Sequence, residues 1–210
     1  MGDWNRTFLT NTQLAGIGFA FLGRQVLIHP TCVIVGASRI MIGDHVRIDP
    51  YTTMLTSDAQ ITIGQHVHVA SGVLLSGSSG ITVEDFAGIS HGVKIFSQSD
   101  DFSGAHLTGP TIPSQFVSTL EGAVVIRRHA VIGANSVIMP GVVVGTGAIL
   151  GSLSLAKDSL ADWGMYAGIP ARFLKQRSMS LLEDEQRLML LEASEVPEAP
   201  GLTSPGESPA

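Results

Sequence analysis

Residues 126–150 read IRRHAVIGANSVIMPGVVVGTGAIL, and a single spacing runs through them. Large aliphatic residues stand six positions apart, at Ile126, Ile132, Ile138, Val144 and Leu150. The residue four positions after each of them is small or β-branched. Because alternate residues of a strand face the same side, each six-residue unit predicts a short strand followed by a turn. Three such units would close a triangular coil of about 18 residues.

The same spacing recurs nearer the N-terminus. Its large aliphatic members form three series: Ile42, Ile48, Met54; Ile63, Val69, Leu75; and Val83, Ile89, Ile95. The second inward positions are Val46, Thr52, Val67, Val73, Ala87, Val93, Ala130, Ser136, Val142, Ala148 and Ser154. The gap from Val83 to Ile126 is 43 residues, which fits one coil plus a loop over residues 97–122.

These columns predict an all-β protein, a parallel β-helix whose stacked coils bury the aliphatic side chains. The open ends of such a stack need caps. We expect an N-terminal cap over residues 1–27, the β-helix over 28–178 and a C-terminal helix over 179–195. Residues 196–210, rich in Pro, Gly, Ser and Glu, are expected to be a disordered tail.

Composition excludes several classes of function. The net charge is −6, acidic residues are concentrated after position 179, and no basic stripe is present, which argues against nucleic-acid binding. The apolar stretch at 14–22 is too short to span a bilayer, and no signal peptide is evident. A single cysteine, Cys32, suits a reducing compartment, so we expect a cytoplasmic protein.

Three segments resemble the hexapeptide-repeat acyltransferases, in particular the maltose and galactoside O-acetyltransferases and the enzymes that O-acetylate surface polysaccharides. Residues 132–142, IGANSVIMPGV, are similar to the last regular coil of that family, and residues 166–172, YAGIPAR, to its closing segment. Residues 96–104, FSQSDDFSG, stand where the family extends an active-site loop. The resemblance implies left-handed winding, a homotrimer, and acetyl-CoA bound in a groove between neighbouring subunits.

The resemblance also implies an enzyme that transfers an acetyl group from acetyl-CoA to a sugar hydroxyl, on a polysaccharide or a sugar-nucleotide precursor. One alternative is an amino-sugar N-acetyltransferase, which would use the same cofactor groove. Another is a non-catalytic trimeric scaffold. A metal-dependent hydratase is disfavoured, because His66 and His68 form a His-x-His pair without an evident third ligand, and no metal is expected.

Acyl transfer to a hydroxyl needs a base with a pKa near neutrality and a donor for the oxyanion. In this chain Asp100 stands where the resembling enzymes carry a loop histidine. We therefore predict a pair in which His91 is the base and Asp100 or Asp101 orients its ring, with His106 as the alternative base. The competing interpretation is that both aspartates cap a turn and both histidines are solvated.

The resemblance places CoA along the last coils. Residues expected to meet the pantetheine arm through their backbone are Gly147, Ala148, Ser152 and Leu153. Cations expected at the phosphates are Lys157, Arg172 and Lys175, although Lys157 and Arg172 also suit ordinary surface positions.

Three further histidines share one position of the repeat. His45, His66 and His129 each stand three residues after an inward aliphatic residue. This register predicts that they occupy the same corner of different coils, exposed to solvent.

Overall fold

The computed structural model describes residues 8–195. The tail predicted over 196–210, and residues 1–7 of the predicted cap, lie outside the described residues. The chain divides into a body that extends to Arg177 and a C-terminal segment that begins at Ser178.

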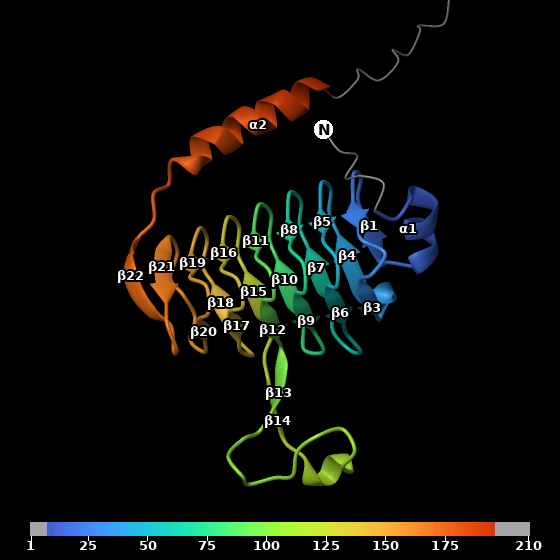
Figure 1. Ribbon diagram of the computed structural model, residues 1–210, viewed down its shortest axis with the longest axis vertical. Coiled ribbons are helices and arrows are strands. Elements are labelled where there is room, and N and C mark those ends of the chain that lie inside the picture. Colours follow the sequence, from blue (N-terminus) through green and yellow to red (C-terminus); the bar gives the residue numbers. More distant parts are fainter. Residues whose placement is uncertain (1–7, 196–210) are drawn as a thin grey trace, which may run out of the picture. The chain divides into compact units, whose positions relative to one another are not determined.

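The body is a parallel β-helix in which each coil contributes one short strand to each of three sheets (Figure 1). Sheet A contains β1 (Phe21–Leu22), β4 (Ile40–Ile42), β7 (Ile61–Ile63), β10 (Ile81–Val83), β15 (Val124–Ile126) and β18 (Val143–Val144). Sheet B contains β2 (Leu27–Ile28), β5 (Arg47–Ile48), β8 (His68–Val69), β11 (Gly88–Ile89), β16 (Val131–Ile132), β19 (Ile149–Leu150), β21 (Gly164–Ala167) and β22 (Arg172–Gln176). Sheet C contains β3 (Val33–Val35), β6 (Thr53–Leu55), β9 (Leu74–Ser76), β12 (Lys94–Phe96), β17 (Val137–Ile138) and β20 (Leu155–Ala156).

The core lies inside this triangle and confirms the predicted columns. Every large aliphatic residue of the six-residue series is at most 1% exposed, and the second inward positions are buried as well. The hydroxyl groups of the polar inward residues donate hydrogen bonds to backbone carbonyls of neighbouring coils. Thr52 Oγ1 donates to the Ala70 carbonyl at 3.1 Å, and Ser136 Oγ donates to the Gly151 carbonyl at 2.8 Å. These polar side chains therefore lower the stability of the core little, because buried polar groups are tolerated when they are hydrogen-bonded.

The corner between sheets A and B carries a stack of rings. His45, His66, Phe86, His129 and Trp163 all have positive φ angles, between 55° and 60°. Ring centroids are 4.7 Å apart for His45–His66 and 4.7 Å for His66–Phe86. The predicted shared corner is correct, but the predicted solvent exposure is wrong, since His129 is 6% exposed and the other two histidines are half-buried. Coils about 4.8 Å apart bring identical corners to the distance at which planar rings stack.

Both ends of the β-helix are covered by the chain itself. Helix α1 (Asn11–Ile17) begins after Thr10, whose side chain forms a capping box with Gln13, and Leu14 is buried against the first coil. At the other end, β22 turns back antiparallel to β21. Arg177 Nη1 then donates to the carbonyls of His129 and Gly147, which ties the closing segment to two coils.

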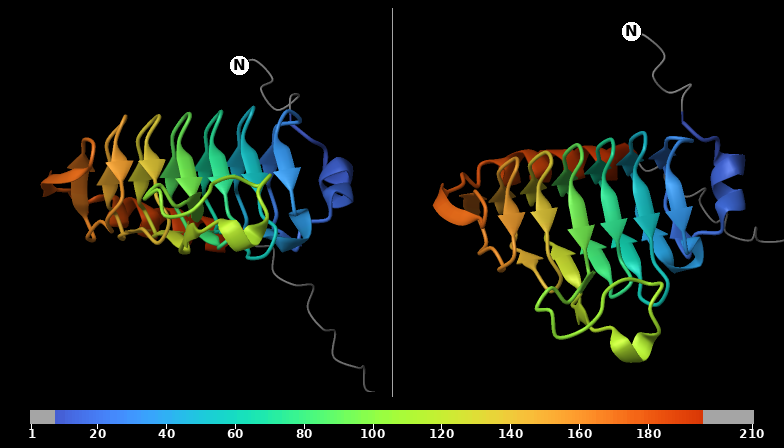
Figure 2. Two further views of the ribbon diagram at one scale, coloured as in Figure 1. Left: turned by 90° about the horizontal axis from the view of Figure 1, so that it is seen from below. Right: turned by 60° about the horizontal axis from the view of Figure 1, so that its bottom comes forward.

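One long excursion interrupts the coils. The chain leaves sheet C after β12 and forms a ribbon of β13 (Gln98–Asp100) and β14 (Thr119–Glu121), with a short 3-10 turn η3 (Ser114–Phe116) near its tip. A second 3-10 turn, η2 (Ala37–Arg39), lies at a corner of the first coils. Strand β15 pairs directly with β10, so winding resumes after the loop. Figure 2 shows this loop projecting from the β-helix.

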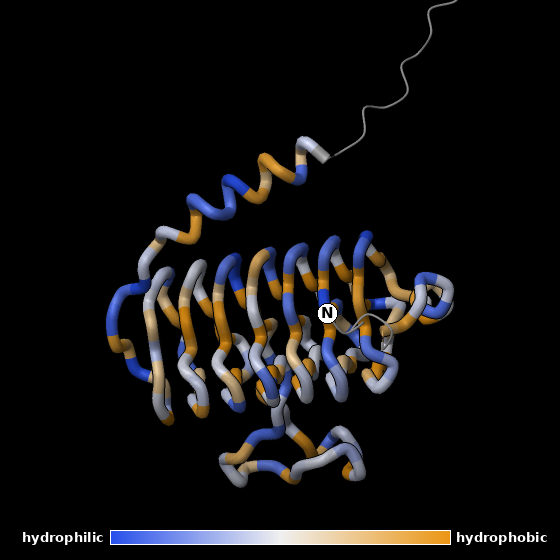
Figure 3. Tube along the Cα trace, turned by 45° about the horizontal axis from the view of Figure 1, so that its top comes forward, coloured by the Kyte–Doolittle hydropathy of each residue, from blue (hydrophilic) through white to orange (hydrophobic). Residues whose placement is uncertain are grey.

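The C-terminal segment contains helix α2 (Leu181–Glu195). Hydrophobic and hydrophilic residues alternate along this helix (Figure 3). Across residues 8–195, no helix combines the length and the apolar character needed to cross a membrane.

Candidate active site

A pocket of about 980 Å³ lies between the projecting loop and the adjoining edge of sheet C. Outward side chains at the ends of the sheet C strands form one side, among them Leu55, Phe96 and Met139. The loop forms the other side, and its apolar contributors include Phe102 and Ile112. The pocket therefore has apolar walls, as binding sites for small molecules commonly do.

Asp100 is the sole ionisable side chain among the residues that line this pocket. It lies on β13, where it pairs with Thr119 of β14, and it is half-buried. The ribbon is held by side chains as well, since Gln98 Nε2 donates to Glu121 Oε1 at 3.1 Å. Within residues 8–195 the Asp100 carboxylate has no hydrogen bond or ion pair, which leaves its oxygens free to accept from a ligand.

Asp101 has a different role from its neighbour. Its Oδ1 accepts from the Ser103 amide at 2.8 Å, and its Oδ2 accepts from the Ser103 hydroxyl at 2.8 Å. These hydrogen bonds hold the pKa of the Asp101 carboxyl below its ordinary value. Asp101 therefore caps a turn of the loop, and His106, in the same loop, is exposed.

His91 lies apart from both aspartates. It occupies the corner between sheets B and C, whereas Asp100 and Asp101 lie beyond the opposite edge of sheet C. No hydrogen bond or ion pair joins His91 to either carboxylate within the described chain. The predicted His91–aspartate pair is thus wrong for a single subunit, because strand β12 crosses the full width of the sheet between them.

The corner that holds His91 continues toward the C-terminal coils. The Asn135 amide donates to the His91 carbonyl at 2.8 Å, and the Leu153 amide donates to the Ala134 carbonyl at 2.9 Å. Leu153 and its neighbour Ser152 are exposed there. The structure therefore brings His91 and two of the residues predicted to bind CoA onto one edge of the β-helix.

Gly147 and Ala148 do not belong to that edge, and the structure does not support their predicted contact with CoA. Ala148 is 0% exposed, and its amide donates to the Gly145 carbonyl. The Gly147 amide donates to the Arg128 carbonyl, while the Gly147 carbonyl accepts from Arg177. The backbone groups of Gly147 and Ala148 are thus hydrogen-bonded within the β-helix itself.

The three predicted phosphate-binding cations are exposed near the C-terminal end of the β-helix. Lys157 follows β20, and its Nζ lies 3.6 Å from the Asp158 carboxylate. Arg172 and Lys175 lie on β22, where the Arg172 guanidinium donates to the neighbouring Ala171 carbonyl. All three side chains are exposed enough to meet an anionic ligand.

The repeat region matches a known family. Residues 123–155 match the family described as bacterial transferase hexapeptide (six repeats). The Escherichia coli dTDP-4-amino-4,6-dideoxy-D-glucose acyltransferase is 33% identical over 178 residues, which cover 85% of this chain and 93% of that protein. This chain belongs to the hexapeptide-repeat acyltransferases.

Two other acyltransferases are similar to much of the chain. The structure of AntD, an N-acyltransferase from Bacillus cereus, has a TM-score of 0.86 at 37% identity and covers 89% of this chain and 98% of that one. The putative lipopolysaccharide biosynthesis O-acetyl transferase WbbJ of E. coli K12 is 26% identical over 141 residues, 67% of this chain and 62% of that protein. The family resemblance, the parallel β-helix and the acyltransferase class predicted from the sequence are confirmed.

Proposed function

We propose that this enzyme transfers an acyl group from acyl-CoA to the amino group of a nucleotide-linked amino sugar. This is the N-transfer alternative that the sequence left open. The observation that carries the proposal is Asp100, a carboxylate that stands alone in an apolar pocket at the position where the resembling O-acetyltransferases carry histidine.

A hydroxyl acceptor and an amine acceptor need different catalytic groups from the enzyme. A hydroxyl group is a poor nucleophile at neutral pH and needs a base with a pKa near 7, whereas an ordinary aspartate has a pKa of about 4. A neutral amine already presents a lone pair. A carboxylate can accept a hydrogen bond from the amine and orient it, so Asp100 suits an amine better than a hydroxyl.

The names of two relatives support the substrate class. The E. coli relative is named for dTDP-4-amino-4,6-dideoxy-D-glucose, and the B. cereus N-acyltransferase has been solved with that compound and coenzyme A. Another structure of the B. cereus protein contains dTDP and 3-hydroxybutyryl-CoA. We extend both the dTDP-linked amino sugar and the CoA donor to this chain.

A second residue follows from the same relative. Structures of the B. cereus protein include variants at one serine and at one aspartate, ten positions apart in the middle part of the chain. Ser90 and Asp100 have that spacing here. The other pair with it, Ser152 and Asp162, lies much nearer the C-terminus. Sequence reasoning missed Ser90, because it follows the buried Ile89 as an ordinary outward residue of the repeat.

Ser90 and Asp100 lie at opposite edges of sheet C within one subunit. Ser90 adjoins the corner that carries His91, and the loop with Asp100 leaves at the far edge. We therefore propose that a second copy completes the site, in the homotrimer that the family resemblance implies. In that assembly the exposed edge with Ser152 and Leu153 would hold CoA beside the neighbour's loop.

In this arrangement the proposed reaction is a direct attack of the acceptor amine on the acyl-CoA thioester. The amine nitrogen attacks the thioester carbonyl carbon while Asp100 accepts a hydrogen bond from the amine. The Ser90 hydroxyl donates to the oxyanion that develops on the carbonyl oxygen. The C–S bond then breaks, the proton of the amine passes to the departing sulfur, and the products are an amide and free CoA thiol.

A matched pair of acceptors tests the proposal. The enzyme is incubated with acetyl-CoA or 3-hydroxybutyryl-CoA and either dTDP-4-amino-4,6-dideoxy-D-glucose or its 4-hydroxy counterpart, and free thiol is measured. We expect free CoA thiol to be released when the amino sugar is the acceptor, and not when the hydroxy compound is. Release with the hydroxy compound alone would establish O-transfer and overturn the proposal, and no release with either would reject this acceptor class.

Replacing Ser90 with alanine is expected to lower kcat by roughly 10²–10³-fold with little change in KM, because one donor to the oxyanion is lost. Steady-state kinetics with the amino-sugar acceptor measure this effect. Ser57→Ala, at an exposed corner where the hydroxyl bonds to Asp58, serves as the control and should retain wild-type rates. A normal kcat for Ser90→Ala would remove Ser90 from the mechanism.

A further inference from the structure

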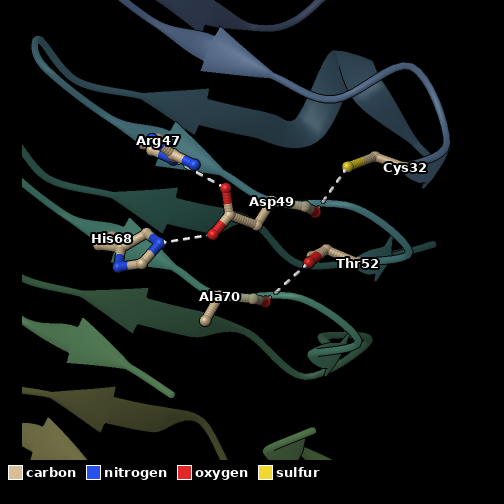
Figure 4. Close-up of polar contacts among 6 residues, drawn as sticks. All are labelled: Cys32, Arg47, Asp49, Thr52, His68 and Ala70. Carbon is tan, nitrogen blue, oxygen red and sulfur yellow. Dashed lines mark hydrogen bonds and ion pairs between the residues drawn. The ribbon is translucent and has the colours of Figure 1, made fainter. Parts of the chain in front are cut away.

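The outer face of sheet B carries a cluster of Arg47, Asp49 and His68 (Figure 4). The Arg47 Nε atom lies 2.8 Å from Asp49 Oδ1, and the His68 Nε2 atom lies 2.8 Å from Asp49 Oδ2. Figure 4 shows the carboxylate between the two side chains, which come from the neighbouring strands β5 and β8. The Asp49 side chain is 10% exposed, whereas those of Arg47 and His68 are 46% and 53% exposed.

The cluster is held rigidly. The guanidinium carbon of Arg47 lies 5.1 Å from the centroid of the Phe8 ring, so Arg47 is fixed by an aromatic face as well as by Asp49. The Cys32 thiol donates to the Asp49 carbonyl at 3.3 Å, which anchors the backbone beneath the carboxylate. This degree of fixation exceeds that of an ordinary surface ion pair, which two flexible side chains form at some entropic cost.

The cluster retains hydrogen-bond donors that no residue of the described chain uses. Within residues 8–195, the two terminal nitrogens of Arg47 and the Nδ1 atom of His68 have no hydrogen-bond partner. Burial alone would raise the pKa of Asp49, but the hydrogen bonds from His68 and Arg47 outweigh it and hold that pKa below its ordinary value. The carboxylate is therefore ionised and aligns the Arg47 guanidinium, whose two terminal nitrogens can still donate to an external oxyanion. In a neutral His68 ring that donates from Nε2 to Asp49, the Nδ1 atom is an acceptor, so His68 serves to hold the carboxylate in place.

Small residues lead from the cluster toward Ser90. His68 pairs with Gly88 on the next strand, and a side chain at Gly88 would meet no atom within 4 Å, so the surface there is open. Ala70 lies between Asp49 and Ser90 in the same row, and at 2% exposure it adds no side chain that would block the path. With strands about 4.8 Å apart, the cluster lies roughly 10 Å from Ser90, a span that suits a hexose with its attached phosphate.

We propose that Arg47, aligned by Asp49, binds the diphosphate of the nucleotide-sugar acceptor, while His68 holds Asp49 in place from the other side. A guanidinium fork matches phosphate oxygens, and Asp49 acts as a positioning residue. The sugar then lies over Gly88 with its amine at Ser90. CoA approaches Ser90 from the opposite side, along the edge with Ser152, so donor and acceptor meet end to end. The identity of the acceptor rests on the proposed function.

Both substrates carry a diphosphate, so the test separates dTDP from CoA. Each is titrated into wild-type protein and into Arg47→Ala by calorimetry, without turnover. We expect Arg47→Ala to weaken dTDP binding by roughly 10- to 100-fold, the loss expected for charge-assisted hydrogen bonds, and to leave CoA binding unchanged. Arg24→Ala is the matched control, since Arg24 also pairs with an aspartate, Asp44, at 2.8 Å but at another corner. It should bind both ligands as the wild type does.

Two further variants keep the result interpretable if Arg47→Ala is unstable. Arg47→Lys retains the charge but not the fork and should weaken dTDP binding by a smaller factor, and His68→Ala should weaken it as well. Circular dichroism and the thermal midpoint confirm folding. Unchanged dTDP binding in all three, loss of CoA binding instead, or no dTDP binding by wild type would overturn the proposal. Because no turnover is needed, these outcomes are independent of whether the amino sugar is acylated.

Discussion

Replacing Asp100 with asparagine is expected to lower kcat/KM for the amino-sugar acceptor by roughly 10²–10⁴-fold, the range associated with removing a group that accepts from a nucleophile. The amide is nearly the same size as the carboxylate but carries no charge and accepts more weakly. Asp100 has no ion pair or side-chain hydrogen bond within the described chain, so the substitution should leave the loop intact. Thiol release under saturating acyl-CoA measures the effect.

The adjacent carboxylate provides the control for that experiment. Asp101 accepts two hydrogen bonds from Ser103 and is turned to the loop's own backbone, so Asp101→Asn should change kcat/KM by a few-fold at most. Equal losses in the two variants would indicate that the loop had been disturbed rather than the chemistry. Full activity in Asp100→Asn would contradict the proposed contact between Asp100 and the amine. It would favour His91 or His106 as the catalytic base.

Replacing Leu150 with alanine is expected to lower the free energy of unfolding by about 2–5 kcal/mol. Leu150 is 0% exposed and lies in the inward column of sheet B, between Ile132 of β16 and Tyr166 of β21. The shortened side chain would leave a cavity that the coils above and below cannot close, because their backbones are fixed by the parallel ladder. Denaturant unfolding at a fixed protein concentration measures the loss.

Leu174→Ala makes the same chemical change at a position that is 62% exposed on β22, and its effect should stay within about 0.5 kcal/mol. A loss below about 1 kcal/mol at Leu150, or equal losses at the two positions, would show that the columns are less tightly packed than the structure indicates.

The six-residue period was sufficient to predict which side chains are buried. Ile132 and Leu150 needed no tertiary information, because a two-residue alternation interrupted at every sixth position has one compact solution, a stacked coil. The loop was equally visible, as a gap of 43 residues where the surrounding coils need about 20. The exposure of corner residues was harder to predict, because it depends on the neighbouring coil. His129 is covered by the stacked ring of Phe86 on one side and the tilted ring of Trp163 on the other.

The candidate site was only half predictable. Asp100 was found from the loop, where it replaces an expected histidine. The sequence places His91 near the root of the same loop, which suggested the pair, but a strand of sheet C separates His91 from Asp100 in space. The Arg47–Asp49–His68 cluster also has a signal in the sequence, since His68 follows Arg47 by one coil, but the spacing of His66 and His68 points instead to a metal pair.

The sequence by itself determined the coil, the inward columns and the position of the loop, because each follows from spacing along the chain. It also indicated the class of enzyme, through the resemblance of residues 132–142 and 166–172 to known acyltransferases. The tertiary structure alone decided which side chains meet across coils. Asp49 accepts hydrogen bonds from Arg47 on β5 and from His68 on the neighbouring strand β8. Asp100 and Asp101 are adjacent in the sequence, yet Asp100 faces a pocket and Asp101 caps a turn. Such contacts depend on the direction of each side chain and on the register between strands, and a repeating one-dimensional pattern contains neither.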